Sequence, residues 1–268
     1  QRNLMIRNHP GLFIAGQILG TSGYEEAAGA GLLAGINASL YIDNKPWFTL
    51  RRDQAYLGVM IDDLVTKGTK EPYRLLSSRS EYRLITRSDN ADERLIKMGY
   101  DLGLNSKDRY DKYLKRMDEL KVAEHALDTI YVGLNEKTPK YLESVGETKP
   151  IGSTSYKDLL KRPKVTYEGL QQCEPKLPVL SSDLGVKIET NVKYKGYIDL
   201  EEKDVEKMQA MESLILPQDL DYSKVEGISL EAREKLNKIK PKTIGEASRI
   251  TNVHPADIDR LLFLIRKK

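Results

Sequence analysis

The stretch from Gly11 to Ser39 constrains the fold of this 268-residue chain more strongly than any other part of its sequence. Leu12 to Ala15 form a short apolar run between glycines, which is typical of a strand buried on both faces. Gly16, Gly20 and Gly23 follow, and a helix rich in small residues comes next. Because a helix N-terminus offers N–H groups to a ligand, this strand, turn and helix are predicted to cradle a polar or anionic group, with tight packing as the alternative.

Composition excludes several kinds of protein. No apolar run is as long as a membrane span and no secretory signal opens the chain, so we expect a soluble, cytoplasmic protein without a membrane partner. The single cysteine, Cys173, allows no intrachain disulfide and no thiolate metal cluster, and it has no histidine beside it to make it a nucleophile. The net charge is only +3, so a nucleic-acid surface would have to come from local clustering of cations.

Two adjacent acids, Asp62 and Asp63, interrupt a short apolar stretch. Paired carboxylates can bind a metal or perform acid–base chemistry. On one helical turn, however, neighbouring side chains point apart, so we expect these two acids to be solvated or to cap a helix. The sequence predicts neither a metal site nor a catalytic residue.

A cluster of arginines follows a possible helix start. Ser78 with Glu81 three residues later matches a capping box, and a helix from that point would place Arg79, Arg83 and Arg87 along one face. A strand would also put the three arginines on one side. Acids or phosphates are expected opposite such a row, so a salt-bridge network and an RNA phosphate track both remain open.

The rest of the chain is predicted to be helical. Ser106 caps a long amphipathic helix, and prolines separate short helical pieces between Pro139 and Pro178. Residues 191–198 interleave tyrosines with lysines, which suits either an RNA contact or packing at a helix entrance. Three short helices close the chain. The last has an apolar face that favours a partner helix over a DNA reader, formed by Ile258, Leu261, Leu262 and Ile265.

Several motifs resemble one family. They are GQ-x-x-G-T-x-G-Y-E-E-A-A with GLLAG-x-N-A, GTKEPYR, SR-x-EYRL, R-x-DNAD-x-RL, V-x-Y-x-GYI, KPKTIGEASRI and HPADIDRLLFLI. Together they resemble the GidA (MnmG) family of tRNA wobble-uridine modification enzymes over nearly the whole chain, most strongly in residues 11–38 and 66–95. The family opens with a dinucleotide fingerprint that this chain lacks, so we expect the C-terminal part of a longer enzyme.

The resemblance implies a mainly α fold, in which helical domains follow a strand–turn–helix remnant of a Rossmann-type FAD-binding domain. It divides the chain into a flavin-domain remnant (1–42), a helical tRNA-facing domain (43–220) and a small helical subdomain for partner docking (221–268). In the family, the enzyme installs an aminomethyl or carboxymethylaminomethyl group on C5 of the wobble uridine. It uses FAD, NADH and methylenetetrahydrofolate, acts with the MnmE GTPase, and is expected to be a homodimer at full length.

Site residues follow from the same resemblance. The expected flavin contacts are Gly16, Gln17, Gly20, Thr21, Gly23, Tyr24 and Glu25. The expected tRNA contacts are Lys67, Lys70, Arg74, Arg79, Arg83, Arg87, Lys193 and Lys195. The apolar face of the last helix would dock the GTPase. The flavin site is expected to be incomplete in this chain, and the isolated chain is expected not to turn over.

One departure from the family concerns Leu19, where asparagine is usual, so a polar contact near the flavin is expected to be missing. Two alternatives stay open. The chain could act as a non-catalytic module that binds RNA or docks a partner, or it could be a relative of the folate-dependent tRNA methyltransferase, which shares flavin motifs. The long helical extension argues against the second.

Overall fold

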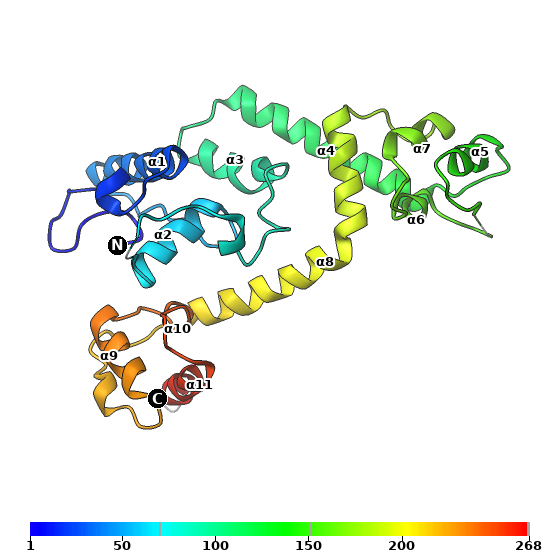
Figure 1. Ribbon diagram of the computed structural model, residues 1–268. Helices are drawn as coiled ribbons and strands as arrows, with labels where there is room; N and C mark the ends of the chain where they lie inside the picture. The colour runs from blue at the N-terminus through cyan, green and yellow to red at the C-terminus, as the bar shows by residue number, and fades with distance from the viewer. Residues whose placement is uncertain (70, 151, 267–268) are drawn as a thin grey trace. The chain divides into compact units, whose positions relative to one another are not determined.

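The structure, a computed structural model, describes residues 1–69, 71–150 and 152–266, and it is mainly helical (Figure 1). Between these helices the described residues form isolated β-bridges and no sheet. The mainly α prediction is therefore confirmed. The helices are α1 (Tyr24–Ile42), α2 (Tyr56–Thr66), α3 (Ala91–Asp101), α4 (Lys107–Thr129), α5 (Lys137–Ser144), α6 (Tyr156–Leu160), α7 (Tyr167–Cys173), α8 (Ser182–Ser213), α9 (Leu230–Ile239), α10 (Ile244–Ser248) and α11 (Pro255–Arg266). Short 3-10 helices are η1 (Gly16–Leu19), η2 (Ser77–Arg79) and η3 (Tyr222–Lys224).

The chain forms two compact units. One comprises Gln1–Thr86 together with Glu201–Lys268, and the other comprises Arg87–Leu200. These boundaries differ from the predicted ones after residues 42 and 220, and the functions assigned to the predicted domains stay predictions. Within the described ranges, every helix is too short or too polar to cross a membrane.

The first unit has its N-terminal core between α1 and α2. The small residues of α1 let the helices approach closely, and Ala30, Leu33 and Met60 are buried between them. Asn37 of α1 is fully buried. Its side chain exchanges hydrogen bonds with the backbone of Phe48, donating to the carbonyl at 2.9 Å and accepting from the N–H at 2.8 Å. The connection to α2 is thereby tied to α1.

The same unit contains a C-terminal bundle of α9, α10 and α11 (Figure 1). Two of its helices begin at hydroxyl caps, because the Ser229 and Thr243 hydroxyls accept from the backbone N–H groups three residues later. The apolar face of α11 packs inward, because Ile258 and Leu261 are buried in the bundle core and Leu262 and Ile265 pack against that core. This corrects the expectation of an exposed docking face: the apolar stripe of α11 covers the short neighbouring helices.

The second unit has its core where α4, α6, α7 and the N-terminal part of α8 meet. Ser106, Ser155 and Thr166 cap three of its helices through their side-chain oxygens, and Ser106 is the cap that the sequence predicted. Cys173 is buried at the end of α7, and burial raises the pKa of its thiol.

The strand predicted at Leu12–Ala15 does not form. Phe13 makes a single antiparallel bridge with Met5, and Leu12 is half exposed. A strand buried on both faces needs paired strands on both sides, and the described residues provide only this one bridge. The segment predicted as strand, turn and helix therefore consists of η1, a turn and α1.

The helix or strand predicted to follow Ser78 does not form either. After η2 the backbone continues as turns until α3. Glu81, the acid expected to complete the capping box, is instead held by the guanidinium group of Arg52 at 2.8 Å. In the described structure no helix or strand spans Arg79, Arg83 and Arg87, so the three arginines do not share a face of one element.

Candidate functional site

The glycine turn closes onto a segment fifty residues further along the chain. Gly16 and Gly20 have φ values of +71° and +98°, which favour glycine, and the Thr21 hydroxyl donates to the Gly16 carbonyl at 3.0 Å. The Gly20 carbonyl accepts from the backbone N–H of Tyr73 at 2.7 Å, and Thr21 and Tyr73 form a parallel bridge. The two sequence blocks that carry the strongest family motifs thus meet in space.

Glu26 makes a second connection between the blocks. Its carboxylate is buried and accepts from the backbone N–H of Leu75 at 2.8 Å, and this bond holds the pKa of Glu26 below its usual value. The other carboxylate oxygen is buried without a hydrogen-bond partner among the described residues. A Cβ atom at Gly23 would lie 1.7 Å from that oxygen, so this glycine makes room for the carboxylate.

A groove of about 340 Å³ opens where the two blocks meet. Its lining offers hydroxyl, amide and backbone groups, and comprises Gln17, Gly20, Thr21, Ser22, Thr69, Glu71 and Pro72. Three of the seven predicted flavin residues therefore line the groove: Gln17, Gly20 and Thr21. Tyr24 and Glu25 are exposed on the first turn of α1, with Tyr24 at 93% exposure.

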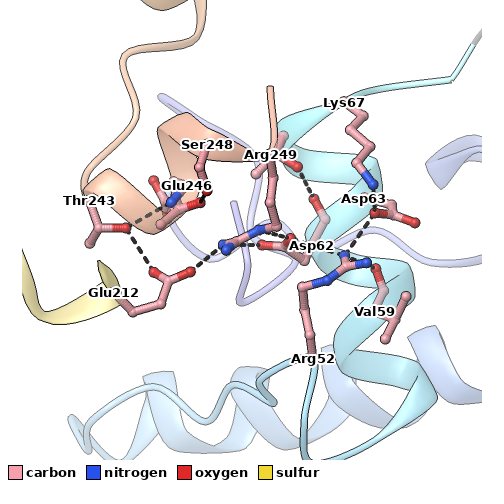
Figure 2. Close-up of polar contacts among 12 residues, drawn as sticks. Arg52, Val59, Asp62, Asp63, Lys67, Glu212, Thr243, Glu246, Ser248 and Arg249 are labelled. Atoms are coloured by element: carbon pink, nitrogen blue, oxygen red, sulfur yellow. Dashed lines mark hydrogen bonds and ion pairs between the residues drawn. The ribbon is translucent and has the colours of Figure 1, made fainter. Parts of the chain in front are cut away.

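A buried cluster of charges lies beside this site, and it corrects the expectation for Asp62 and Asp63. Both acids are buried on α2, with exposures of 3% and 2%. Figure 2 shows Asp62 between the guanidinium groups of Arg52 and Arg249, at 3.1 and 2.7 Å. Asp63 accepts from Arg52 at 2.8 Å and from Lys67 at 2.7 Å. The acids can be buried because Arg52, Lys67 and Arg249 neutralise them.

The surroundings of Asp63 keep it ionised. Burial alone would raise the pKa of this carboxyl, but hydrogen bonds from Lys67 and Arg52 hold it below the usual value. The Tyr73 hydroxyl donates to the same carboxylate at 2.9 Å, and burial together with this bond raises the pKa of Tyr73. Asp63 therefore stays a charged partner for Arg52 and Lys67. No group of three or more potential metal ligands occurs among the described residues.

Three of the predicted RNA-binding cations are exposed on the segment that leaves the groove. Arg74, Arg79 and Arg83 are exposed, and none of them has an ion pair recorded within the described ranges. The Arg79 guanidinium lies over the Tyr73 ring, 4.6 Å from its centre, and the Arg79 carbonyl accepts from Arg52 at 3.3 Å. These contacts place Arg79 beside the glycine turn.

The other predicted RNA-binding residues have structural partners or are not described. Lys67 pairs with Asp63, and Lys70 lies outside the described residues. In the second unit, Arg87 pairs with Asp89 at 2.9 Å, and Lys195 pairs with an acid one turn later on α8. The Lys193 ammonium donates to the carbonyl oxygens of residues 163 and 165, at 3.2 and 2.7 Å. These bonds favour a packing role for Lys193.

Sequence reasoning missed Glu26, Arg52 and Arg249. A signal existed for Glu26, since it stands three residues after Gly23, the cap of α1, where a capping-box acid is expected. Arg52 and Arg249 carried no local signal, because their carboxylate partners lie on another element.

Three family models match the chain. Residues 204–268 match the tRNA modifying enzyme MnmG/GidA C-terminal helical bundle, and residues 107–202 match the MnmG/GidA C-terminal helical domain. Residues 1–46 match glucose inhibited division protein A. The matched segments include the glycine turn, the helical core of the second unit and the C-terminal bundle.

Curated proteins and a solved structure that resemble the chain belong to the same family as these models. The tRNA uridine 5-carboxymethylaminomethyl modification enzymes MnmG of Clostridium kluyveri and Caldicellulosiruptor saccharolyticus are 46% and 44% identical over 96% and 100% of the chain. The chain spans 41% and 43% of their lengths. Crystal form II of Aquifex aeolicus GidA superposes with a TM-score of 0.81 at 40% identity, covering 98% of this chain and 41% of that one. The chain belongs to the GidA/MnmG family.

Proposed function

We propose that this chain forms part of a tRNA uridine 5-carboxymethylaminomethyl modification enzyme, the activity for which its relatives are named. The observation that carries the proposal is the closure of the glycine turn onto the segment around Tyr73, with Arg79 stacked on that tyrosine. This arrangement brings a polar groove and exposed cations together on one unit. Such a pairing suits a cofactor site next to an RNA surface.

We infer that the groove completes a site for FAD. Its hydroxyl and amide groups can hydrogen-bond the polar edge of a flavin, and Gln17 and Thr21 would hold that edge. Glu26 lies outside the lining of the groove and would support the site by holding the two blocks together through its bond to Leu75. The flavin, when bound, supplies the redox chemistry. In the whole enzyme, NADH and methylenetetrahydrofolate would serve as reductant and one-carbon donor.

RNA binding is assigned to Arg74, Arg79 and Arg83. Guanidinium groups bind phosphate oxygens bidentately, and exposed arginines without carboxylate partners do not have to break an ion pair to do so. The other open interpretation, a salt-bridge network, fits Arg52 and Arg87, which have carboxylate partners. The arginines therefore divide into structural and RNA-facing groups.

Further partners are proposed for the whole enzyme. The C-terminal bundle would dock the MnmE GTPase through residues other than its core, such as the exposed Phe263 of α11. A homodimer acting in the cytoplasm would be the working assembly.

Filter binding of unmodified tRNA, at two salt concentrations and with duplex DNA as competitor, tests the assignment. The chain should bind tRNA in a salt-dependent manner that DNA does not reverse, and R79A/R83A should weaken binding at least about tenfold. Lys235→Ala removes an exposed cation from α9 and serves as the control. Equal affinities for R79A/R83A, K235A and the unaltered chain would reject RNA binding by this segment. A flavin fluorescence titration of the same samples separates a flavin-binding protein from a module that binds RNA alone.

A further inference from the structure

The turn from Ser80 to Thr86 carries the exposed Arg83 and is closed by its own polar groups. The Thr86 hydroxyl donates to the Tyr82 carbonyl at 2.7 Å, and the Ser80 and Thr86 hydroxyls lie 3.4 Å apart. Ser80 and Thr86 are buried. The backbone of this turn therefore has a defined conformation from which Arg83 projects.

Glu201 of α8 holds the same turn from outside it. One carboxylate oxygen accepts hydrogen bonds from the backbone N–H groups of Leu84, at 3.0 Å, and Ile85, at 3.1 Å. Successive N–H groups that converge on one point form a nest that favours an anion. Bonds from neutral donors to a carboxylate are also stronger than bonds between neutral groups. The backbone next to Arg83 is thus anchored by a residue more than a hundred positions away in the sequence.

The opposite side of the segment is anchored too. Arg52 binds the carboxylate of Glu81 at 2.8 Å and the carbonyl of Arg79 at 3.3 Å. Arg52 is buried and also bonded to acids of α2, so its position is fixed. Glu201 lies only partly buried and makes no recorded contact with that cluster within the described ranges. Glu201 can therefore be altered without disturbing the buried charges.

We propose that Glu201 is a positioning residue for RNA binding, whose carboxylate fixes the backbone beside Arg83 in the conformation that meets an RNA phosphate. The inference rests on the proposed RNA-binding role of Arg83. An ordered turn binds more tightly because less conformational entropy is lost on association. The predicted sign is unusual: removing an acid near an RNA surface ordinarily strengthens binding, whereas removing Glu201 weakens it.

Three variants of the whole chain test the proposal: E201A, E201Q and E202A. Glutamine keeps an acceptor oxygen but loses the charge, and Glu202 is an exposed acid at the next position of α8, so E202A controls for charge alone. Amide hydrogen exchange of Leu84 and Ile85, measured without RNA, reports directly on the hydrogen bonds from these two N–H groups to the Glu201 carboxylate. Filter binding of tRNA reports its consequence, and the double variant E201A/R83A reports coupling.

E201A should speed exchange of both amides and weaken tRNA binding by about as much as R83A, about tenfold. E201Q should restore most of the affinity, E202A should not weaken binding, and E201A/R83A should bind like R83A alone. Unchanged exchange in E201A, or affinity in E201A equal to or above that in E202A, would overturn the positioning role. If R83A itself binds tRNA normally, the proposed RNA function of Arg83 fails instead. The exchange data then still show whether Glu201 holds the backbone N–H groups of Leu84 and Ile85.

Discussion

Replacing Arg52 by methionine tests how the first unit is held together. Arg52 is 3% exposed, and its guanidinium group contacts Asp62, Asp63 and Glu81. Methionine keeps the unbranched, flexible stem but lacks the guanidinium group and its charge. Two buried carboxylates would then lose a cationic partner in a place where water cannot replace it.

The expected loss in free energy of unfolding depends on which contacts the three acids keep in R52M. Breaking a buried ion pair typically costs about 3–5 kcal/mol, because it leaves an uncompensated charge. Here Asp62 keeps Arg249, and Asp63 keeps Lys67 and Tyr73, while Glu81 is half exposed and regains water. The cost should therefore fall at the lower end, about 3 kcal/mol.

An exposed pair in the same connection supplies the control. Lys45 pairs with Asp43 at 2.9 Å, and the two side chains are 61% and 48% exposed. An exposed pair of this kind contributes about 0–1 kcal/mol, so K45M should change stability little. Both variants remove one cation between α1 and α2, so they carry the same net charge.

Urea unfolding followed by fluorescence gives the comparison, because the single tryptophan, Trp47, lies in the same unit and stacks on Tyr41. At pH 7 the free energy of unfolding should fall by about 3 kcal/mol in R52M and by less than about 1 kcal/mol in K45M. Equal losses in the two variants would refute the role given to the buried cluster.

The difference in free energy of unfolding between the unaltered chain and R52M should also depend on pH. The pKa of Asp63 is lowered in the folded chain, so its stabilising effect is complete above the unfolded pKa, about 3.9, and is lost as the pH falls through the lower folded pKa. The difference between the unaltered chain and R52M should therefore narrow below about pH 4. A difference that is constant from pH 7 to pH 3 would contradict this electrostatic account.

Two further substitutions test the glycine turn and the connection to α2. Gly23→Ala should destabilise the chain by about 1–3 kcal/mol in the same urea assay, because the added Cβ displaces the Glu26 carboxylate from the backbone N–H of Leu75. Gly31→Ala is the control, since a Cβ there meets nothing within 4 Å, and it should stabilise the chain by about 0.5–1 kcal/mol. Equal effects of the two would contradict the close approach at Gly23. Asn37→Ala should cost about 2–3 kcal/mol and alter Trp47 fluorescence, because the Phe48 backbone loses both its bonds to Asn37, while Ser39→Ala at an exposed site should do neither.

Local signals predicted the helices well. Ser106, Ser229 and Thr243 begin helices because their hydroxyls can satisfy nearby backbone N–H groups, and this requires nothing beyond the neighbouring residues. The periodic apolar positions of α4 and α11 likewise marked core faces. The partner-docking role expected for the α11 face could not be derived in the same way, since apolar periodicity does not distinguish a bundle core from a docking surface.

Polar contacts between residues far apart in the sequence could not be predicted from the sequence. Asp62 and Asp63 appear on a helix as ordinary surface acids, and only the fold brings Arg52 and Arg249 to them. Glu81 matches a capping box, yet Arg52 binds it more favourably than a helix N-terminus would, and the predicted helix is lost. The glycine pattern predicted a cradle at the turn, but it gave no sign that the segment around Tyr73 would form the other side, since no local pattern pairs segments fifty residues apart.

The salt dependence of tRNA affinity tests the central claim most directly. The logarithm of the association constant should fall linearly with the logarithm of salt concentration, with a slope of about 0.7–0.9 for each phosphate contacted. If Arg79 and Arg83 each contact one phosphate, R79A/R83A should reduce the slope by about 1.4–1.8, whereas K235A should leave it unchanged. A slope that is identical in R79A/R83A and the unaltered chain would contradict the claim that this segment binds RNA.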